Sequence, residues 1–184
     1  MKTSQTQSNT QGFTIIETLV AITILMIAIA GPLTVANKAL TAAVYARDQM
    51  IASYLAQDGM EYVKNVRSTD KLTDATGAWL RSFSSCGSSS TYCKVDTVKG
   101  IISQDNSIGG SGDQLYLTVV PTLSSNPFYT HDSSGIPTQF HRYFNVVPSP
   151  ANASEAEITM TVSWQTGTLA NSVILHNTIY DVLQ

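Results

Sequence analysis

The residue types that most often carry catalysis or bind metals are sparse in this sequence. The three histidines are His131, His141 and His176, and none has another candidate ligand at a metal-binding spacing. There is no G-x-S-x-G nucleophile motif, no P-loop and no G-x-G-x-x-G dinucleotide motif. These absences predict that the protein is not an enzyme and that it uses no metal or other cofactor.

The most unusual chemical group is the carboxylate of Glu17, which stands at the start of an apolar segment. Residues 18–37 carry no charge, and in a helix they span about 30 Å, the thickness of a bilayer's hydrocarbon core. An acid in such a segment costs about 2.5–3.5 kcal/mol at the centre and less near an end. Two interpretations stay open: Glu17 lies at the headgroup level and stabilises the helix N-terminus, or it has a functional role.

A cleaved secretory signal peptide is one interpretation of the apolar segment, because the small residues Ala39, Ala42 and Ala43 follow it. Two features weaken this interpretation. The run is long for the apolar region of such a signal, and it contains Glu17.

Residues 12–17, Gly-Phe-Thr-Ile-Ile-Glu, with the apolar helix after them, resemble the class III signal of type IV prepilins and type II secretion pseudopilins. The resemblance implies that prepilin peptidase cuts between Gly12 and Phe13 on the cytoplasmic side. The new amine of Phe13 would then be N-methylated, and Glu17 would be the fifth residue of the mature chain. The leader has only one basic residue, Lys2, so its orientation signal is weak.

The resemblance also gives Glu17 a role in assembly. In a filament core of staggered apolar helices, a buried carboxylate needs a partner, and the N-terminal amine of a neighbouring subunit is the natural one. We hypothesise that this pair sets the axial register of each added subunit, as a buried polar residue does in a coiled coil. The implied partners are prepilin peptidase, other pilin subunits, the inner-membrane assembly platform and, before assembly, membrane lipid.

Past the apolar segment, the spacing of large side chains predicts that the helix continues as an amphipathic helix to about Val66 and stops at residues 67–70. Gly31-Pro32 leave a local unwinding open, and Gly59 either permits close packing or is simply tolerated. Residues 53–67 resemble the helix of V-type minor pilins and I-type pseudopilins, although an ordinary amphipathic helix would look similar. The expected apolar face comprises Leu40, Val44, Ile51, Leu55, Tyr62 and Val66, widened by Met50, Tyr54 and Val63.

The C-terminal two-thirds predict a β-rich domain. Alternating residues indicate strands at 94–102, 114–120, 141–147, 157–165 and 172–182, with a hairpin turn at 165–171 and a short helical turn at 77–83. We therefore expect an α+β fold in which the long helix packs on an antiparallel sheet of about four strands. This order of elements resembles the pilin fold.

Cys86 and Cys93 lie in one polar loop. A disulfide is favoured over a metal site, which lacks further ligands, and over a redox pair, which is more often C-x-x-C. It also suits an exported domain in an oxidising compartment. Residues 105–113 hold oxygen ligands suited to Ca²⁺, but they do not match the EF-hand loop and are better interpreted as a flexible turn.

Charge divides the chain into three regions, 1–37, 38–67 and 68–184. The resemblance divides the first of them again, so that the expected parts are a leader (1–12), a membrane and filament-core helix (13–37), an amphipathic helix (38–67) and a globular domain (68–184). With only 10 Lys+Arg, a nucleic-acid partner is not expected. The sequence favours a structural subunit, a minor pilin or pseudopilin, made as a bacterial inner-membrane precursor and assembled into a pilus-like or secretion filament. The rivals are a membrane-tethered exported binding domain that does not polymerise and an enzyme anchored by an uncleaved helix.

Overall fold

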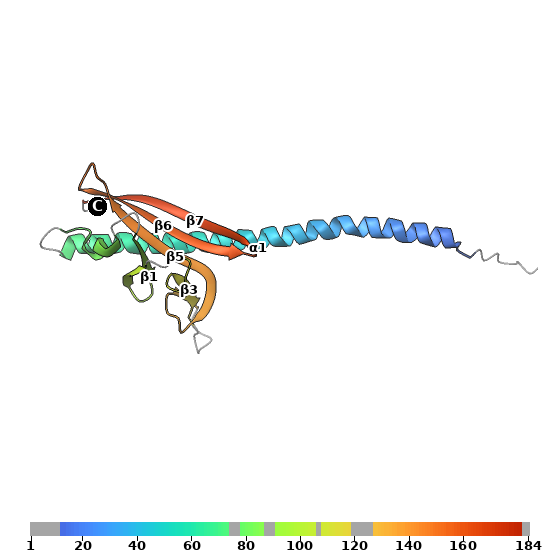
Figure 1. Ribbon diagram of the computed structural model, residues 1–184, viewed down its shortest axis with the longest axis horizontal. Coiled ribbons are helices and arrows are strands. Elements are labelled where there is room, and N and C mark those ends of the chain that lie inside the picture. Colours follow the sequence, from blue (N-terminus) through green and yellow to red (C-terminus); the bar gives the residue numbers. More distant parts are fainter. Residues whose placement is uncertain (1–11, 74–77, 87–90, 106–107, 119–126, 182–184) are drawn as a thin grey trace, which may run out of the picture. The chain divides into compact units, whose positions relative to one another are not determined.

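The computed structural model describes residues 12–73, 78–86, 91–105, 108–118 and 127–181. The chain forms two compact units, one ending at Val44 and the other beginning at Tyr45, and helix α1 (Ile15–Thr73) contributes residues to both. The second unit also contains the short 3₁₀-helix η1 (Arg81–Cys86) and a seven-stranded sheet (Figure 1). The expected α+β class, with one long helix and an antiparallel sheet, is confirmed.

Helix α1 does not stop at residues 67–70, as the sequence predicted, but runs on to Thr73. The hydroxyls of Ser68 and Thr69 donate to the carbonyls of Lys64 and Asn65, one helical turn back, at 3.0 Å each. These side chains therefore bond within the helix instead of competing with it. Asp70 accepts hydrogen bonds from both the backbone N–H and the hydroxyl of Ser82, which ties the helix end to η1.

Among the residues that the structure describes, the sheet has seven strands, so the expectation of about four strands was wrong. Strand β5 is its centre: one edge pairs with β6, and the other is shared by β3 and β1. Every pairing is antiparallel. The strands are β1 (Tyr92–Asp96), β2 (Ile101–Asp105), β3 (Gln114–Leu117), β4 (Tyr129–Thr130), β5 (Ile136–Pro148), β6 (Glu155–Thr166) and β7 (Leu169–Tyr180).

Part of the miscount comes from the single strand expected at 94–102, which is a hairpin of β1 and β2. Asp96 turns the chain, because its Oδ1 accepts the backbone N–H groups of Val98 and Lys99, and Gly100 follows with a φ of 70°. The other carboxylate oxygen of Asp96 accepts the Thr130 hydroxyl at 2.5 Å and the His131 N–H at 3.0 Å. Burial alone would raise the pKa of the Asp96 carboxyl, but these hydrogen bonds lower it below its usual value.

The hairpin of β6 and β7 agrees with its prediction. Thr166 pairs with Leu169, so the loop has two residues, and its first residue, Gly167, has a φ of 63°. A positive φ at that position alone is the signature of a type II′ turn, whose twist matches that of the flanking strands. The ladder then runs without interruption to the pair of Glu155 and Tyr180.

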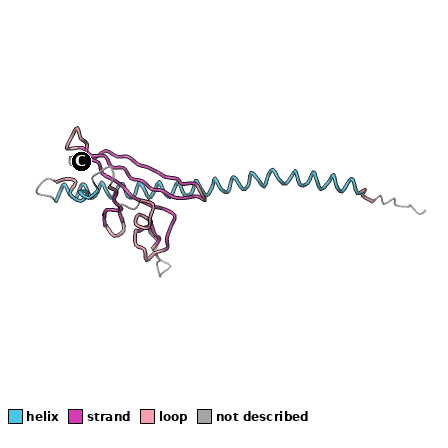
Figure 2. The backbone as a smooth tube through the Cα atoms, viewed as in Figure 1, coloured by secondary structure: helices cyan, strands magenta, loops and turns pink. Residues whose placement is uncertain are grey.

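The core of the second unit lies between α1 and one face of the sheet (Figure 2). The helix contributes a stripe of small and medium side chains, and the large Met50 and Tyr54 of the expected face are instead exposed, Tyr54 by 65%. Gly59 lies on this stripe, where an added Cβ would stand 3.0 Å from Cε of Met160. It therefore permits a close approach of helix and sheet. The buried helix residues are Asp48, Ala52, Leu55, Ala56, Gly59, Met60, Val63 and Arg67.

One fully buried cation, Arg142 of β5, connects the helix with the sheet. Its guanidinium donates to the Leu55 carbonyl (3.1 Å) and the Asp58 carboxylate (2.9 Å) of α1, and to the Val95 carbonyl (2.8 Å) of β1. Burial lowers the pKa of Arg142, and the Asp58 carboxylate counteracts that effect. Because the three acceptors belong to two elements, Arg142 fixes the position of α1 against β1.

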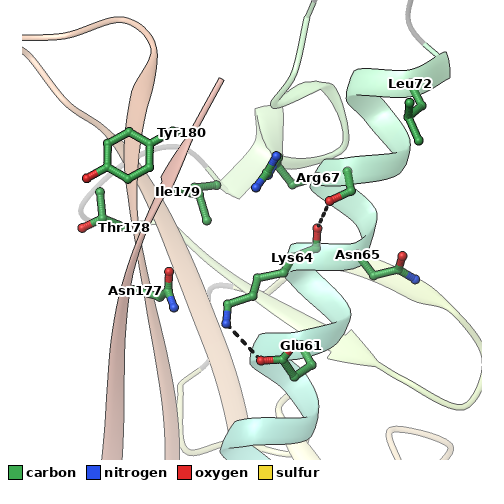
Figure 3. A pocket seen from close by; sticks show the side chains of 10 residues that line it. Glu61, Lys64, Asn65, Arg67, Leu72, Asn177, Thr178, Ile179 and Tyr180 are labelled. Carbon is green, nitrogen blue, oxygen red and sulfur yellow. Dashed lines mark hydrogen bonds and ion pairs between the residues drawn. The ribbon is translucent and has the colours of Figure 1, made fainter. Parts of the chain in front are cut away.

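The C-terminal turns of α1 and edge strand β7 enclose a cavity of about 730 Å³ (Figure 3). It carries charge on the helix side, where the Lys64 ammonium lies 2.9 Å from the Glu61 carboxylate. Asn177, Thr178 and Tyr180 line the strand side.

Candidate processing and assembly segment

The residues singled out near the N-terminus lie where helix α1 begins. Gly12, Phe13 and Thr14 are not helical, and α1 starts at Ile15. The Thr14 hydroxyl accepts the backbone N–H of Glu17 at 3.3 Å, and the Thr14 carbonyl accepts the N–H of Thr18. Thr14 is thus the N-cap, and Glu17 stands at the third helical position of a T-x-x-E capping sequence.

The Glu17 carboxylate is exposed, and no described residue forms an ion pair with it. In the first turn it faces the partial positive charge of the unpaired N–H groups, which is a favourable place for an anion. The structure therefore agrees with the simpler interpretation of Glu17 as a helix-start acid. It leaves the carboxylate oxygens available to a group from outside the chain.

The peptide bond between Gly12 and Phe13 lies in accessible, non-helical backbone. Apart from the chain neighbours of Gly12, no atom of the described residues stands within 4 Å of where a Cβ on Gly12 would be, and the Phe13 side chain is 81% exposed. Cleavage at this bond would leave α1 and its cap intact, because the cap begins at Thr14.

From Ile15 to Val44, every side chain of α1 is exposed, although most are apolar. The helix is long and apolar enough to cross a membrane by length and composition. It continues without a break through Gly31-Pro32, so the local unwinding left open by the sequence does not occur. The threonine hydroxyls of this part bond to carbonyls three or four residues back, for example Thr34 to Ala30 at 2.8 Å, so these hydroxyls are paired within the helix.

Comparison with known families matches residues 7–31 to the prokaryotic N-terminal methylation motif. The chain carries the N-terminal signal of the type IV prepilin and pseudopilin family. With the apolar helix, this signal indicates a type IV pilin-like exported subunit and fits a membrane-anchored precursor. No curated protein and no solved structure matches the chain.

The two cysteines of this prepilin-like chain form a disulfide. Cys86 ends η1 and Cys93 lies in β1, with their Cα atoms 5.5 Å apart and both side chains fully buried. The helical turn expected at 77–83 is η1, displaced toward the C-terminus, and Gly77 lies outside the described residues. The disulfide therefore connects the segment after α1 to the sheet.

Among the residues that the structure describes, the loop considered for Ca²⁺ contributes to no group of three or more His, Cys, Asp or Glu that could hold a metal ion. Asn106 and Ser107 lie outside those residues. Asp113, which is 1% exposed, uses both carboxylate oxygens inside the protein: Oδ2 accepts the Gly109 N–H at 2.8 Å, and Oδ1 lies 2.9 Å from His141 Nδ1. An ion would have to displace both partners.

The three histidines differ in burial and in their hydrogen-bond partners more than their sequence positions suggested. His131 is largely buried, and its Nδ1 lies 3.1 Å from the Gln114 carbonyl, whereas His176 is exposed beside Glu157. His141 is the one that sequence reasoning underestimated, because its partner Asp113 comes from a different segment. The only signal in the sequence was the alternation that puts His141 and Gln139 on the same face of β5.

Proposed function

We propose that the chain is a minor pilin or pseudopilin: a structural subunit that polymerises through α1 into a type IV pilus-like or type II secretion filament. The observation that carries the proposal is the methylation motif at residues 7–31, joined to a helix whose apolar surface the chain leaves uncovered from Ile15 to Val44. Lipid covers that surface in the precursor, and the helices of neighbouring subunits cover it in the filament. The second unit, with its own core, is the part carried on the filament surface.

In this proposal the precursor lies in the bacterial inner membrane with its C-terminal unit outside. Prepilin peptidase cuts between Gly12 and Phe13, and the new amine of Phe13 is methylated. The accessible backbone before Thr14 supports this site, because a protease needs an exposed, unfolded segment. The mature chain would then meet other pilin subunits through the inner-membrane assembly platform.

Mass spectrometry of the chain from its native membrane tests the processing step. We expect the mature chain to begin at methylated Phe13, and Gly12→Val to leave the leader attached. An intact Met1 in the native chain would support the rival, a tethered exported domain that does not polymerise. A terminus after the Ala39–Ala43 region would instead indicate ordinary secretion.

Glu17 tests the assembly step. In a filament core its carboxylate would need a charged partner, and a neighbouring Phe13 amine would supply one. We therefore expect Glu17→Ala and Glu17→Gln to be processed normally but to be depleted from sheared filaments. Glu61→Ala, which removes an exposed carboxylate from the second unit, is the matched control and should assemble as the native chain does. Normal amounts of both Glu17 variants in the filaments would contradict the register role.

A further inference from the structure

The outer face of the sheet carries a second, smaller cavity, of about 370 Å³, formed at the junction of β3, β5, β6 and β7. His141 and Ser163 are directly paired across β5 and β6, and Gln139 and Gln165 lie two residues from them on the same face. The intervening Phe140, Arg142, Val162 and Trp164 are buried, and Trp164 also lines the cavity. Strand alternation therefore brings two amides, a hydroxyl and an imidazole together on one face of the sheet.

The described lining of this cavity contains amides, hydroxyls and one imidazole, together with Gly109, Trp164 and Ala170, and no Lys, Arg, Asp or Glu. In this it differs from the cavity of Figure 3, which Glu61, Lys64 and Arg67 line. A phosphate or carboxylate ligand would meet no fixed positive charge here, and a metal ion would meet no carboxylate. The lining instead suits a ligand whose groups both donate and accept hydrogen bonds.

Part of the lining is held rigidly by the fold. The buried Asp113 carboxylate fixes His141 through Nδ1, so the other ring nitrogen, Nε2, remains for the cavity. Gln114 is held at both ends of its amide: Nε2 donates to the Thr138 carbonyl at 2.8 Å, and Oε1 accepts the Tyr116 hydroxyl at 3.2 Å. These contacts make the site partly preorganised, which reduces the entropy cost of binding.

Three further polar side chains of the lining form no hydrogen bond within the described part of the protein. Gln139, Ser163 and Gln165 form no side-chain hydrogen bond with any described residue. These two primary amides and the hydroxyl therefore add hydrogen-bond donors and acceptors to the lining. Its volume is at the small end of the range for small-molecule sites.

We propose that this cavity binds an uncharged, polyhydroxylated ligand, a saccharide, through Gln139, His141, Ser163 and Gln165. Each sugar hydroxyl both donates and accepts, and so do the amide and hydroxyl side chains that line the cavity. The assignment is a binding site and not a catalytic one, because no hydrogen bond joins His141 to Ser163 in the described part of the chain. It is independent of whether the chain polymerises, because every residue of the cavity belongs to the second unit.

The test uses the full chain in a detergent without a sugar headgroup, presented to an array of neutral and acidic glycans. Binding of each saccharide retained by the array is then measured by saturation-transfer NMR, with the saccharide free in solution and not attached to a surface. We expect at least one neutral saccharide to bind, and Gln165→Glu and Gln139→Glu each to weaken it at least tenfold, since each replaces an amide donor by a carboxylate. Gln57→Glu, the same change at an exposed position of α1 outside the cavity, should bind as the native chain does.

Thermal unfolding of each variant without saccharide shows whether its fold is intact, and only a variant with an unchanged midpoint is used. The proposal is overturned if the array retains no neutral saccharide. It is also overturned if binding survives both cavity substitutions, or if inorganic phosphate competes with the saccharide for the site.

Discussion

Arg142 shows how strongly one side chain can determine the packing of this molecule. It is fully buried in a strand whose neighbours Phe144 and Val146 are apolar, yet its guanidinium meets acceptors on α1 and β1. A buried cation is tolerated only when it is paired and hydrogen-bonded, and here Asp58 and two carbonyls accept from the two terminal nitrogens, whereas Nε is buried without an acceptor among the described residues. The helix–sheet contact therefore has a polar anchor inside an apolar core.

Replacing Arg142 by Met should lower the free energy of unfolding of the second unit by about 3 kcal/mol. The methionine keeps most of the apolar stem but leaves the Val95 carbonyl buried without this donor, and Asp58 keeps only its hydrogen bond from the Thr97 hydroxyl and loses its charged partner. Urea unfolding of the full chain in detergent, followed by tryptophan fluorescence, measures the change. Lys99→Met removes a cation from an exposed ion pair with Asp132 and should leave the unfolding midpoint unchanged. Equal midpoints for Arg142→Met and the native chain would contradict the anchoring role.

His131 should make the second unit less stable in mild acid. Burial, with the nearby Arg142 charge, lowers the pKa of His131 from 6.5 to about 4, so the folded chain holds this imidazole neutral. Below pH 6.5 the unfolded chain binds a proton that the folded chain does not. The free energy of unfolding should therefore fall as pH drops from 6.5 to about 4, by up to about 3 kcal/mol from this group.

Unfolding midpoints measured between pH 7 and pH 4 test this expectation, with the range chosen to bracket the two pKa values. His131→Phe should flatten the dependence in that interval, whereas His176→Gln, at an exposed position, should not. Asp96 acts in a different window: its pKa is lowered on folding, so its contribution is present above its ordinary value of 3.8 and is lost below it. An unchanged slope in His131→Phe would show that other groups carry the acid sensitivity.

At the scale of elements, the contact between α1 and β6 depends on the missing side chain of Gly59. Alanine at this position should raise the free energy of unfolding by up to about 1 kcal/mol through its higher helix propensity. Its Cβ, however, would stand 3.0 Å from Cε and 3.1 Å from Sδ of Met160. We expect this close contact to cancel the gain in stability in the single variant Gly59→Ala. In a Met160→Ala background those two atoms are absent, and the same substitution should be more favourable by at least about 1 kcal/mol.

The unfolding free energies of the four chains in this double-mutant cycle measure the coupling directly. A coupling near zero would mean that helix and sheet do not meet closely at Gly59. If Gly59→Ala still lowers the free energy of unfolding in the Met160→Ala background, the steric clash would be with Arg142 instead. The Cδ atom of Arg142 lies 3.2 Å from the same Cβ position.

An element could be predicted from the sequence where consecutive residues carry a clear pattern of apolar and polar side chains, and not where they lack one. Alternation marks β6 and β7 because one face of each strand is polar and the other is apolar over many residues. The predicted face of α1 was right in part, because Leu55 and Val63 are buried in the core. It missed Ala52 and Ala56, which carry little apolar signal, and it wrongly included the larger Tyr54, which is exposed. Strand β4, with two residues, is too short for any pattern.

The same reasoning explains why the N-terminal processing segment could be recognised in the sequence and the cavity beside His141 could not. The N-terminal signal could be predicted because residues 12–17 are contiguous and the apolar helix follows them directly, and residues 7–31 match the methylation motif. The Asp113–His141 pair could not, since it exists only through the pairing of β3 with β5. Residues that become neighbours through strand register leave no trace in their own spacing.

At the scale of the whole molecule, the two units should be separable. Every buried residue of the apolar core lies between Ala52 and Ile179, and none of the described residues before Tyr45 is buried. A chain beginning at Tyr45, exported so that Cys86 and Cys93 can pair, should therefore fold on its own and stay in solution without detergent. The full chain should require detergent, because it exposes an apolar helix surface that water solvates poorly.

Size-exclusion chromatography and thermal unfolding compare the shortened chain with the full chain. We expect a single monomeric species with an unfolding midpoint close to that of the full chain in detergent. Treatment with a reductant should lower the midpoint in both, because the disulfide closes a loop next to the core in each. An aggregated or unfolded fragment would show that residues before Tyr45 are needed for the fold, and it would remove the physical basis for a filament subunit built from an assembly helix and an independently folded surface unit.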